Sequence, residues 1–100
     1  MKYQLEQSVR DEVHRLFDAE DVESVIAKLQ TTKLMWERSA PPPRVHIAVL
    51  WLSNGNFDKF KMVIDEARSD WRNTLVRSGL GNDDWQQMLN ESGIDCSEWC

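Results

Sequence analysis

The alternation of apolar and polar positions predicts a chain built from helices. In residues 5–18, apolar side chains recur every three or four positions and charged side chains fill most of the places between them. This spacing collects the apolar side chains on one face of a helix. Residues 22–29 repeat the pattern, and Asp18 or Asp21 is a favoured residue for starting the second helix. We therefore expect one helix that ends near Asp18 and a second that ends near Gln30.

The stretch "PPPRVHIAVLWLSNGNF", residues 41–57, is apolar for most of its length. Its β-branched residues favour a strand, and periodicity does not decide so short a run. Pro42 or Pro43 fits the first turn of a helix, and Asn54-Gly55 is typical of a helix end. No other segment reads as a partner strand. We therefore predict a central helix at about residues 44–53, buried on most sides, with an exposed interface along part of it as the alternative.

Three more helices follow this central helix. Asn56 is placed to cap a helix with apolar positions from residue 57 to 67, and Ser69 or Asp70 begins the next, which "SGLG" at residues 78–81 closes. Asn82 is expected to cap the last helix, which ends at Gly93.

Two segments fall outside this helical pattern. Residues 31–43 read as an irregular, proline-containing connection, and residues 94–100 as a loose tail or a last docked turn. The sequence thus predicts a single all-α domain, residues 1–100, of five or six short helices around the central apolar one.

Composition narrows the possible partners. The chain of 100 residues is 41% hydrophobic with five tryptophans, which suffices for one packed core. Its net charge is −5, and the eight basic residues against five acidic ones in residues 31–81 lie between two acidic ends. This distribution gives no broad electrostatic surface for nucleic acid or an anionic membrane. The charged N-terminus and the short apolar runs predict neither a signal peptide nor a membrane span, so we expect a cytoplasmic protein.

Histidine and cysteine give little sign of a metal or catalytic site. Cys96 and Cys100 are four residues apart, and free thiols are expected in a cytoplasm, although a bridge or a metal remains open. The intervals between His14, His46 and the two cysteines match no compact zinc-binding module. A buried His46 is expected to be hydrogen-bonded and inert. We therefore expect no cofactor and no metal.

Residues 44–75, "RVHIAVLWLSNGNFDKFKMVIDEARSDWRNTL", have a distinctive order. They combine an Arg-Val-x-Ile-Ala-x-Leu-x-Leu helix, a Ser-x-Gly turn, an Asp-Lys pair, and Ala-x-x-Asp-x-Arg-x-x-Leu. This third of the chain resembles a group of short bacterial proteins of unknown function. Trp71 and Asn73 depart from its usual tyrosine and aspartate. The resemblance implies a bacterial, intracellular helical protein and carries no activity or catalytic residues.

The cluster Asp70-Trp71-Arg72 is the most distinctive local feature. In a structural interpretation Asp70 caps a helix, Trp71 points inward, and Arg72 binds a carboxylate or carbonyl of the N-terminal helices. In a functional interpretation Trp71 and Arg72 anchor a partner. Trp36, in the connection, and Arg44, at the start of the central helix, complete the candidate interaction residues.

These features favour a non-enzymatic protein that acts through protein contacts, as an accessory or regulatory protein or by self-association. The alternative is a nucleic-acid-binding or transcription-associated helical module, because the short helices of residues 44–79 with their tight turns imitate a helix-turn-helix. An enzyme is a third class. No nucleophile elbow, metalloprotease motif or converging carboxylate pair occurs, so no catalytic residue is assigned.

Overall fold

The computed structural model describes residues 5–32 and 43–97, and this part of the chain is helical without any strand. The described residues form α1 (Gln7–Leu16), α2 (Ala19–Thr31), α3 (Pro43–Ser53), α4 (Phe57–Ser69), α5 (Trp71–Ser78) and α6 (Trp85–Glu91). The prediction of one small all-α domain with five or six short helices is therefore confirmed. The predicted irregular connection lies almost entirely outside the described residues.

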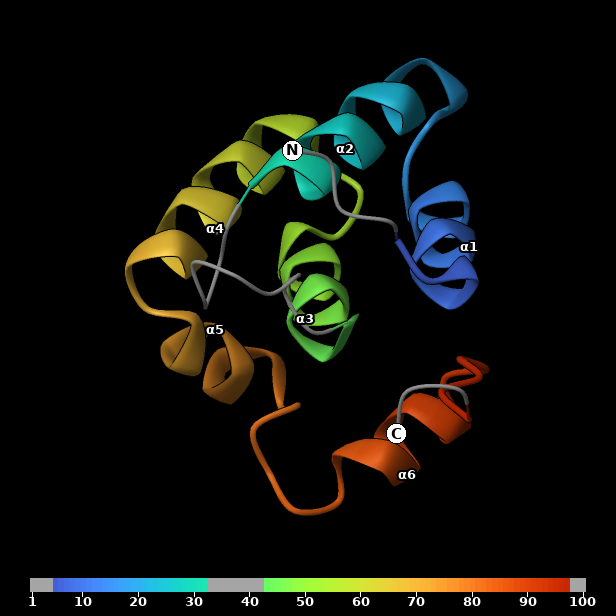
Figure 1. Cartoon of the computed structure of the whole chain (residues 1–100), viewed down its shortest axis with the longest axis vertical. Coiled ribbons are helices and arrows are strands. Elements are labelled where there is room, and N and C mark those ends of the chain that lie inside the picture. The colour runs from blue at the N-terminus through green and yellow to red at the C-terminus, as the bar shows by residue number, and fades with distance from the viewer. Residues whose placement is uncertain (1–4, 33–42, 98–100) are drawn as a thin grey trace.

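Helix α3 occupies the centre of the fold. Figure 1 shows it in green, with α1, α2, α4 and α5 arranged around it and α6 below. Six consecutive α3 residues, from Val45 to Leu50, are buried. Since consecutive residues of a helix point about 100° apart, such a run requires neighbours on every side. Contacts with α1, α4 and α5 supply them, which confirms the predicted central helix.

Local signals in the sequence explain where α3 ends and α4 begins. Pro43 takes the first position of α3, where the missing N–H of proline removes no helical hydrogen bond. Asn54 and Gly55 both have positive φ, 49° and 79°, and turn the chain out of the helix. The side chain of Asn56 then accepts a hydrogen bond of 2.9 Å from the backbone N–H of Lys59, as the prediction of a cap requires.

Helices α4 and α5 share a single residue, Asp70. Its backbone N–H donates to the carbonyl of Glu66 at the end of α4, over 2.8 Å. Its carboxylate accepts from the backbone N–H of Asn73 in the first turn of α5, over 3.2 Å. The predicted cap is confirmed, and Gly79, with a φ of 88°, ends α5.

Asn82 does not cap the last helix, contrary to the prediction. Its side-chain amide donates instead to the carbonyl of Gly79, over 3.3 Å. A turn therefore intervenes, and α6 begins at Trp85, after Asp84 in the N-cap position without a side-chain cap bond. The side chain of Asn82 therefore bonds to the residue that ends α5 and does not cap the start of α6.

The segment after α6 packs against the rest of the protein. Ile94 and Cys96 are both buried within the hydrophobic core. Cys96 is disulfide-bonded, so the expectation of a free thiol is wrong for this residue. Closing so short a loop gives a disulfide little entropic stabilisation, but burial in the core also holds Cys96 in place. Cys100 lies outside the described residues.

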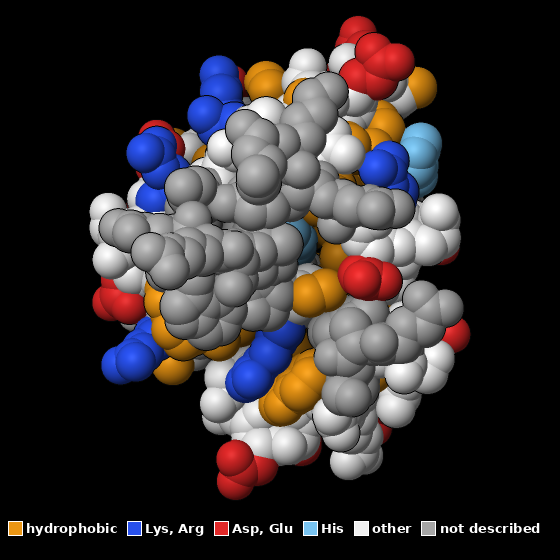
Figure 2. Space-filling model, viewed as in Figure 1, with side chains coloured by type: hydrophobic (Ala, Val, Ile, Leu, Met, Phe, Trp, Pro, Cys, Tyr) orange, Lys and Arg blue, Asp and Glu red, His pale blue; other side chains and the backbone are white. Residues whose placement is uncertain are grey.

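The surface that Figure 2 shows carries acidic and basic side chains interspersed, without a large area of one sign. Among the described residues, Met62 and Val76 are the exposed large hydrophobic side chains, at 64% and 70%. Within the described ranges, no helix combines the length and the apolar character that crossing a membrane requires.

Candidate functional site

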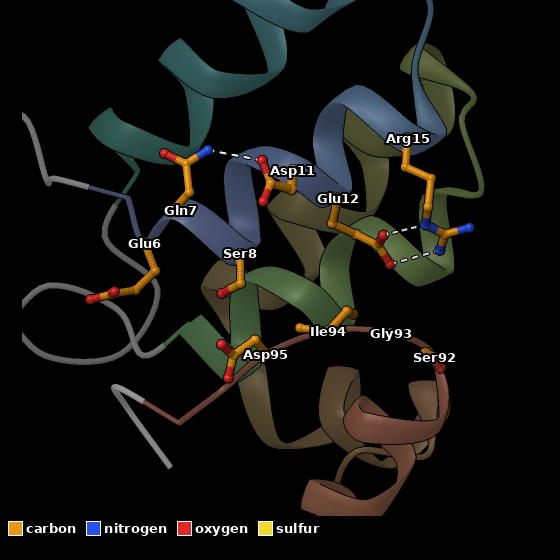
Figure 3. A pocket seen from close by; sticks show the side chains of 10 residues that line it. All are labelled: Glu6, Gln7, Ser8, Asp11, Glu12, Arg15, Ser92, Gly93, Ile94 and Asp95. Carbon is orange, nitrogen blue, oxygen red and sulfur yellow. Dashed lines mark hydrogen bonds and ion pairs between the residues drawn. The ribbon is translucent and has the colours of Figure 1, made fainter.

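A groove of about 370 Å³ separates α1 from the chain segment that follows α6. Figure 3 shows α1 on one side and residues 92–95 on the other. The lining is polar apart from Ile94 and the backbone of Gly93, and four of its side chains are carboxylates. Glu6, Gln7, Ser8, Asp11, Glu12, Arg15, Ser92, Gly93, Ile94 and Asp95 form this lining. We call it the α1 groove.

Glu12 forms the base of the α1 groove and ties it to the core. Its side chain is 2% exposed, whereas that of Arg15 is 58% exposed. Arg15 donates to the Glu12 carboxylate twice, from Nε to Oε1 over 2.5 Å and from Nη2 to Oε2 over 2.8 Å. Trp51 of α3 donates from Nε1 to Oε2 over 2.6 Å. The carboxylate thus joins α1 to α3 with three donors, and hydrogen bonding to it raises the pKa of Arg15.

Three carboxylates of the α1 groove remain without a cation. Glu6, Asp11 and Asp95 form no ion pair within the described residues, because Arg15 is engaged by Glu12. Asp11 accepts a hydrogen bond of 2.8 Å from Nε2 of Gln7, which Figure 3 marks with a dashed line. Hydrogen bonds from Ser97 lower the pKa of Asp95, so this side chain is ionised at neutral pH. The groove therefore presents negative charge to the solvent.

A second hollow of about 280 Å³ adjoins the first and shares Arg15 and Ser92 with it. Leu16, Trp51 and Asn54 complete its lining, so the indole of Trp51 is reached from outside. Together the two hollows offer acidic groups at one end and an aromatic ring with an arginine at the other. This arrangement is suited to binding a chain of mixed polar and apolar side chains.

Trp71 and Arg72, two of the predicted interaction residues, adjoin each other on α5. Trp71 packs in part against the core, and the Arg72 guanidinium lies 5.2 Å from the centroid of its ring. Arg72 is exposed and makes no bond with the described residues of the N-terminal helices. That part of the structural interpretation is wrong, because the cation is held over the neighbouring indole instead.

Arg44 is engaged within the chain. Its Nε donates to the carbonyl of Leu80 over 2.8 Å, and its guanidinium carbon lies 4.5 Å from the ring centroid of Trp85. Burial lowers the pKa of this guanidinium. These contacts join the start of α3 to Leu80, which follows α5, and to Trp85, the first residue of α6. Arg44 thus contacts Leu80 and Trp85, Arg72 contacts Trp71, and Trp36 lies outside the described residues.

The two histidines occupy different environments. His14 is exposed on α1, whereas His46 is 3% exposed within α3. The expectation that a buried His46 is hydrogen-bonded is wrong for the described part of the chain, in which both of its buried ring nitrogens lack a partner. No group of three or more potential metal ligands among His, Cys, Asp and Glu occurs within residues 5–32 and 43–97.

The α1 groove and its buried carboxylate escaped sequence reasoning. Glu12 follows the acidic Asp11 in a helix whose other charged residues face solvent, and nothing local distinguishes the two. The available signal was the helical spacing, because Glu12 is adjacent on the helix surface to the buried Val9 and to Leu16. Trp51, near the end of the apolar helix, carries the indole N–H that donates to Glu12.

Comparisons of this chain with protein-family models, with characterised proteins and with solved structures found no match. The resemblance of residues 44–75 to short bacterial proteins therefore stays a prediction.

Proposed function

We propose that this protein is a small non-enzymatic accessory or regulatory protein, and that it binds a basic segment of another protein in the α1 groove. The observation that carries the proposal is the set of carboxylates of Glu6, Asp11 and Asp95 around a concave surface, none of which forms an ion pair with another described residue. Lysine and arginine side chains complement such a surface, and charge complementarity directs association.

The second hollow extends the same binding surface. A basic side chain near Asp11 would leave the following residues of the partner close to Trp51, whose ring offers apolar area at the edge of the core. Tryptophan and arginine commonly dominate the free energy of binding at protein interfaces. Trp51 and Arg15 would then take the role that the sequence suggested for Trp71 and Arg72.

A cytoplasmic location belongs to the same proposal as an expectation. The disulfide of Cys96 counts against it, because disulfides persist mainly in oxidising compartments. Nucleic-acid binding stays an untested alternative. Of the two arginines on α5, Arg77 is paired with Glu66 over 2.6 Å, whereas Arg72 forms no ion pair with any described residue.

The test uses a blocked tetralysine peptide as the probe and amide chemical shifts of the full chain as the readout. We expect shifts to cluster at α1 and at residues 92–95. The double variant Glu6→Gln/Asp11→Asn should weaken binding roughly two- to thirtyfold, since an exposed pair of charges contributes about 0.2–1 kcal/mol. The matched control is Glu20→Gln/Glu23→Gln, which removes the same charge from exposed positions of α2.

Equal weakening by both double variants, or shifts spread evenly over the molecule, would show attraction to net charge and refute the groove. Light scattering of the pure protein identifies self-association. If the protein is a dimer that Glu6→Gln/Asp11→Asn dissociates and the control does not, then the basic segment comes from a second copy.

A further inference from the structure

His46 occupies an unusual position for an ionisable residue. It is the fourth residue of α3 and lies within the run of six consecutive buried residues. Its side chain is therefore enclosed in whichever direction it points. Neither Nδ1 nor Nε2 has a hydrogen-bond partner among residues 5–32 and 43–97, and both atoms are buried.

Buried polar atoms in native proteins are nearly always paired, so an imidazole with two unpaired nitrogens requires an explanation. A neutral imidazole has one donor and one acceptor, whereas the protonated ring has two donors and a positive charge. The protonated ring consequently needs an acceptor or a counter-charge that the neutral ring does without.

The helices packed against α3 offer no such counter-charge in the described structure. From α1, Glu12 is buried, but its carboxylate is occupied by Arg15 and Trp51. The buried residues of α4 and α5 are not ionisable. The charged residues of these two helices are exposed, namely Asp58, Lys59, Lys61, Asp65, Glu66, Arg68, Arg72 and Arg77.

On α3 itself the other ionisable group is Arg44, a cation that would repel a protonated ring. On α1 the remaining charged or titratable groups, Arg10, Asp11, His14 and Arg15, are exposed or half-exposed. Burial alone lowers the pKa of His46 to about 4. The geometry and this shift agree that the folded state excludes the proton.

We propose that His46 is an acid-sensitive trigger of this fold: a proton on its second ring nitrogen is incompatible with the packing around α3, so mild acid opens the core there. The direction of the pH effect on stability follows from the difference in proton binding between the folded and unfolded states. The pKa of His46 is below that of an unfolded histidine, about 6.5, so the unfolded state binds the proton more readily. Stability is therefore complete above the unfolded pKa and is lost as the pH falls toward about 4.

The experiment is urea unfolding of the full chain at pH 8 and pH 5.5, above the range in which most carboxylates titrate. With pKa values of about 6.5 unfolded and about 4 folded, the folding equilibrium constant should fall about tenfold between these pH values. His46→Leu should remove this dependence. His14→Leu, the matched control on the surface of α1, should keep it.

A direct titration of the imidazole by NMR provides a test that needs no variant. We expect the His46 ring to stay neutral in the folded protein at pH 5.5. A ring that titrates between pH 6 and 7 with the fold intact would overturn the proposal. So would a wild-type equilibrium constant that changes less than twofold between pH 8 and pH 5.5, or one whose change persists in full in a folded His46→Leu variant.

Discussion

Removing the exposed Arg15 should destabilise the protein more than removing the charge of the buried Glu12. In Arg15→Ala the Glu12 carboxylate keeps the Trp51 donor alone, while its side chain is 2% exposed. A buried carboxylate that loses two charge-assisted hydrogen bonds cannot recover them fully from water. In Glu12→Gln, by contrast, the Arg15 side chain is 58% exposed and returns to the solvent.

The expected loss of unfolding free energy depends on which group each substitution leaves buried without a partner. Breaking a fully buried ion pair costs about 3–5 kcal/mol when the remaining charge is buried. The exposure of Arg15 shows that water reaches the outer side of this pair, so we expect about 2–3 kcal/mol for Arg15→Ala. Glu12→Gln retains a carbonyl oxygen for the indole of Trp51 and should cost about 1 kcal/mol.

The assay is urea unfolding at pH 7.5, followed by far-ultraviolet circular dichroism, on both single variants and on the double variant. The double variant Arg15→Ala/Glu12→Gln should be more stable than Arg15→Ala alone, because it carries no unpaired buried charge. Additive losses in the double variant, or a loss for Glu12→Gln that exceeds that for Arg15→Ala, would refute the reasoning.

Two further pairs of variants test the packing. Gly55→Ala places its Cβ 2.4 Å from the carbonyl oxygen of Leu16 at a φ of 79°, so thermal or urea unfolding should show a loss of more than about 2 kcal/mol. Gly93→Ala has a φ of 82° with open space around the Cβ, and about 1 kcal/mol is expected; equal losses would contradict the role given to the clash. Phe60→Ala empties a fully buried position and should cost about 3–5 kcal/mol, whereas Met62→Ala, at 64% exposure, should change the unfolding free energy by less than about 0.5 kcal/mol. A small loss for Phe60→Ala would mean that this position is not the core of the fold.

Most helix boundaries were predictable because their signals act within one turn of the chain. Pro43, Asn56 and Gly79 each favour their observed conformations through their own geometry or through a bond to a residue three positions away. Asn82 was mispredicted because its side chain is oriented to donate back to the carbonyl of Gly79, and a cap would need its oxygen to accept from the start of α6; sequence alone does not decide between these orientations.

The candidate site was not predictable in the same way. The α1 groove joins α1 to residues 92–95, near the opposite ends of the sequence, and its shape depends on how α6 is placed. The helical spacing places Glu12 beside buried apolar residues, but its partner, the indole of Trp51, comes from another helix and has no local signal. The environment of His46 likewise depends on how the helices pack around α3, whereas the sequence indicated the apolar stripes of α4 and α5 only one at a time.

Because Asp70 is the single residue between α4 and α5, the positions of these two helices are coupled. No slack separates the two helices, and the ion pair between Arg77 and Glu66 braces the bend from outside. A partner that displaced α5 would therefore also displace the end of α4, since no flexible linker separates the two helices. Inserting even one flexible residue after Asp70 would uncouple the end of α4 from the start of α5, so that the two helices could move independently.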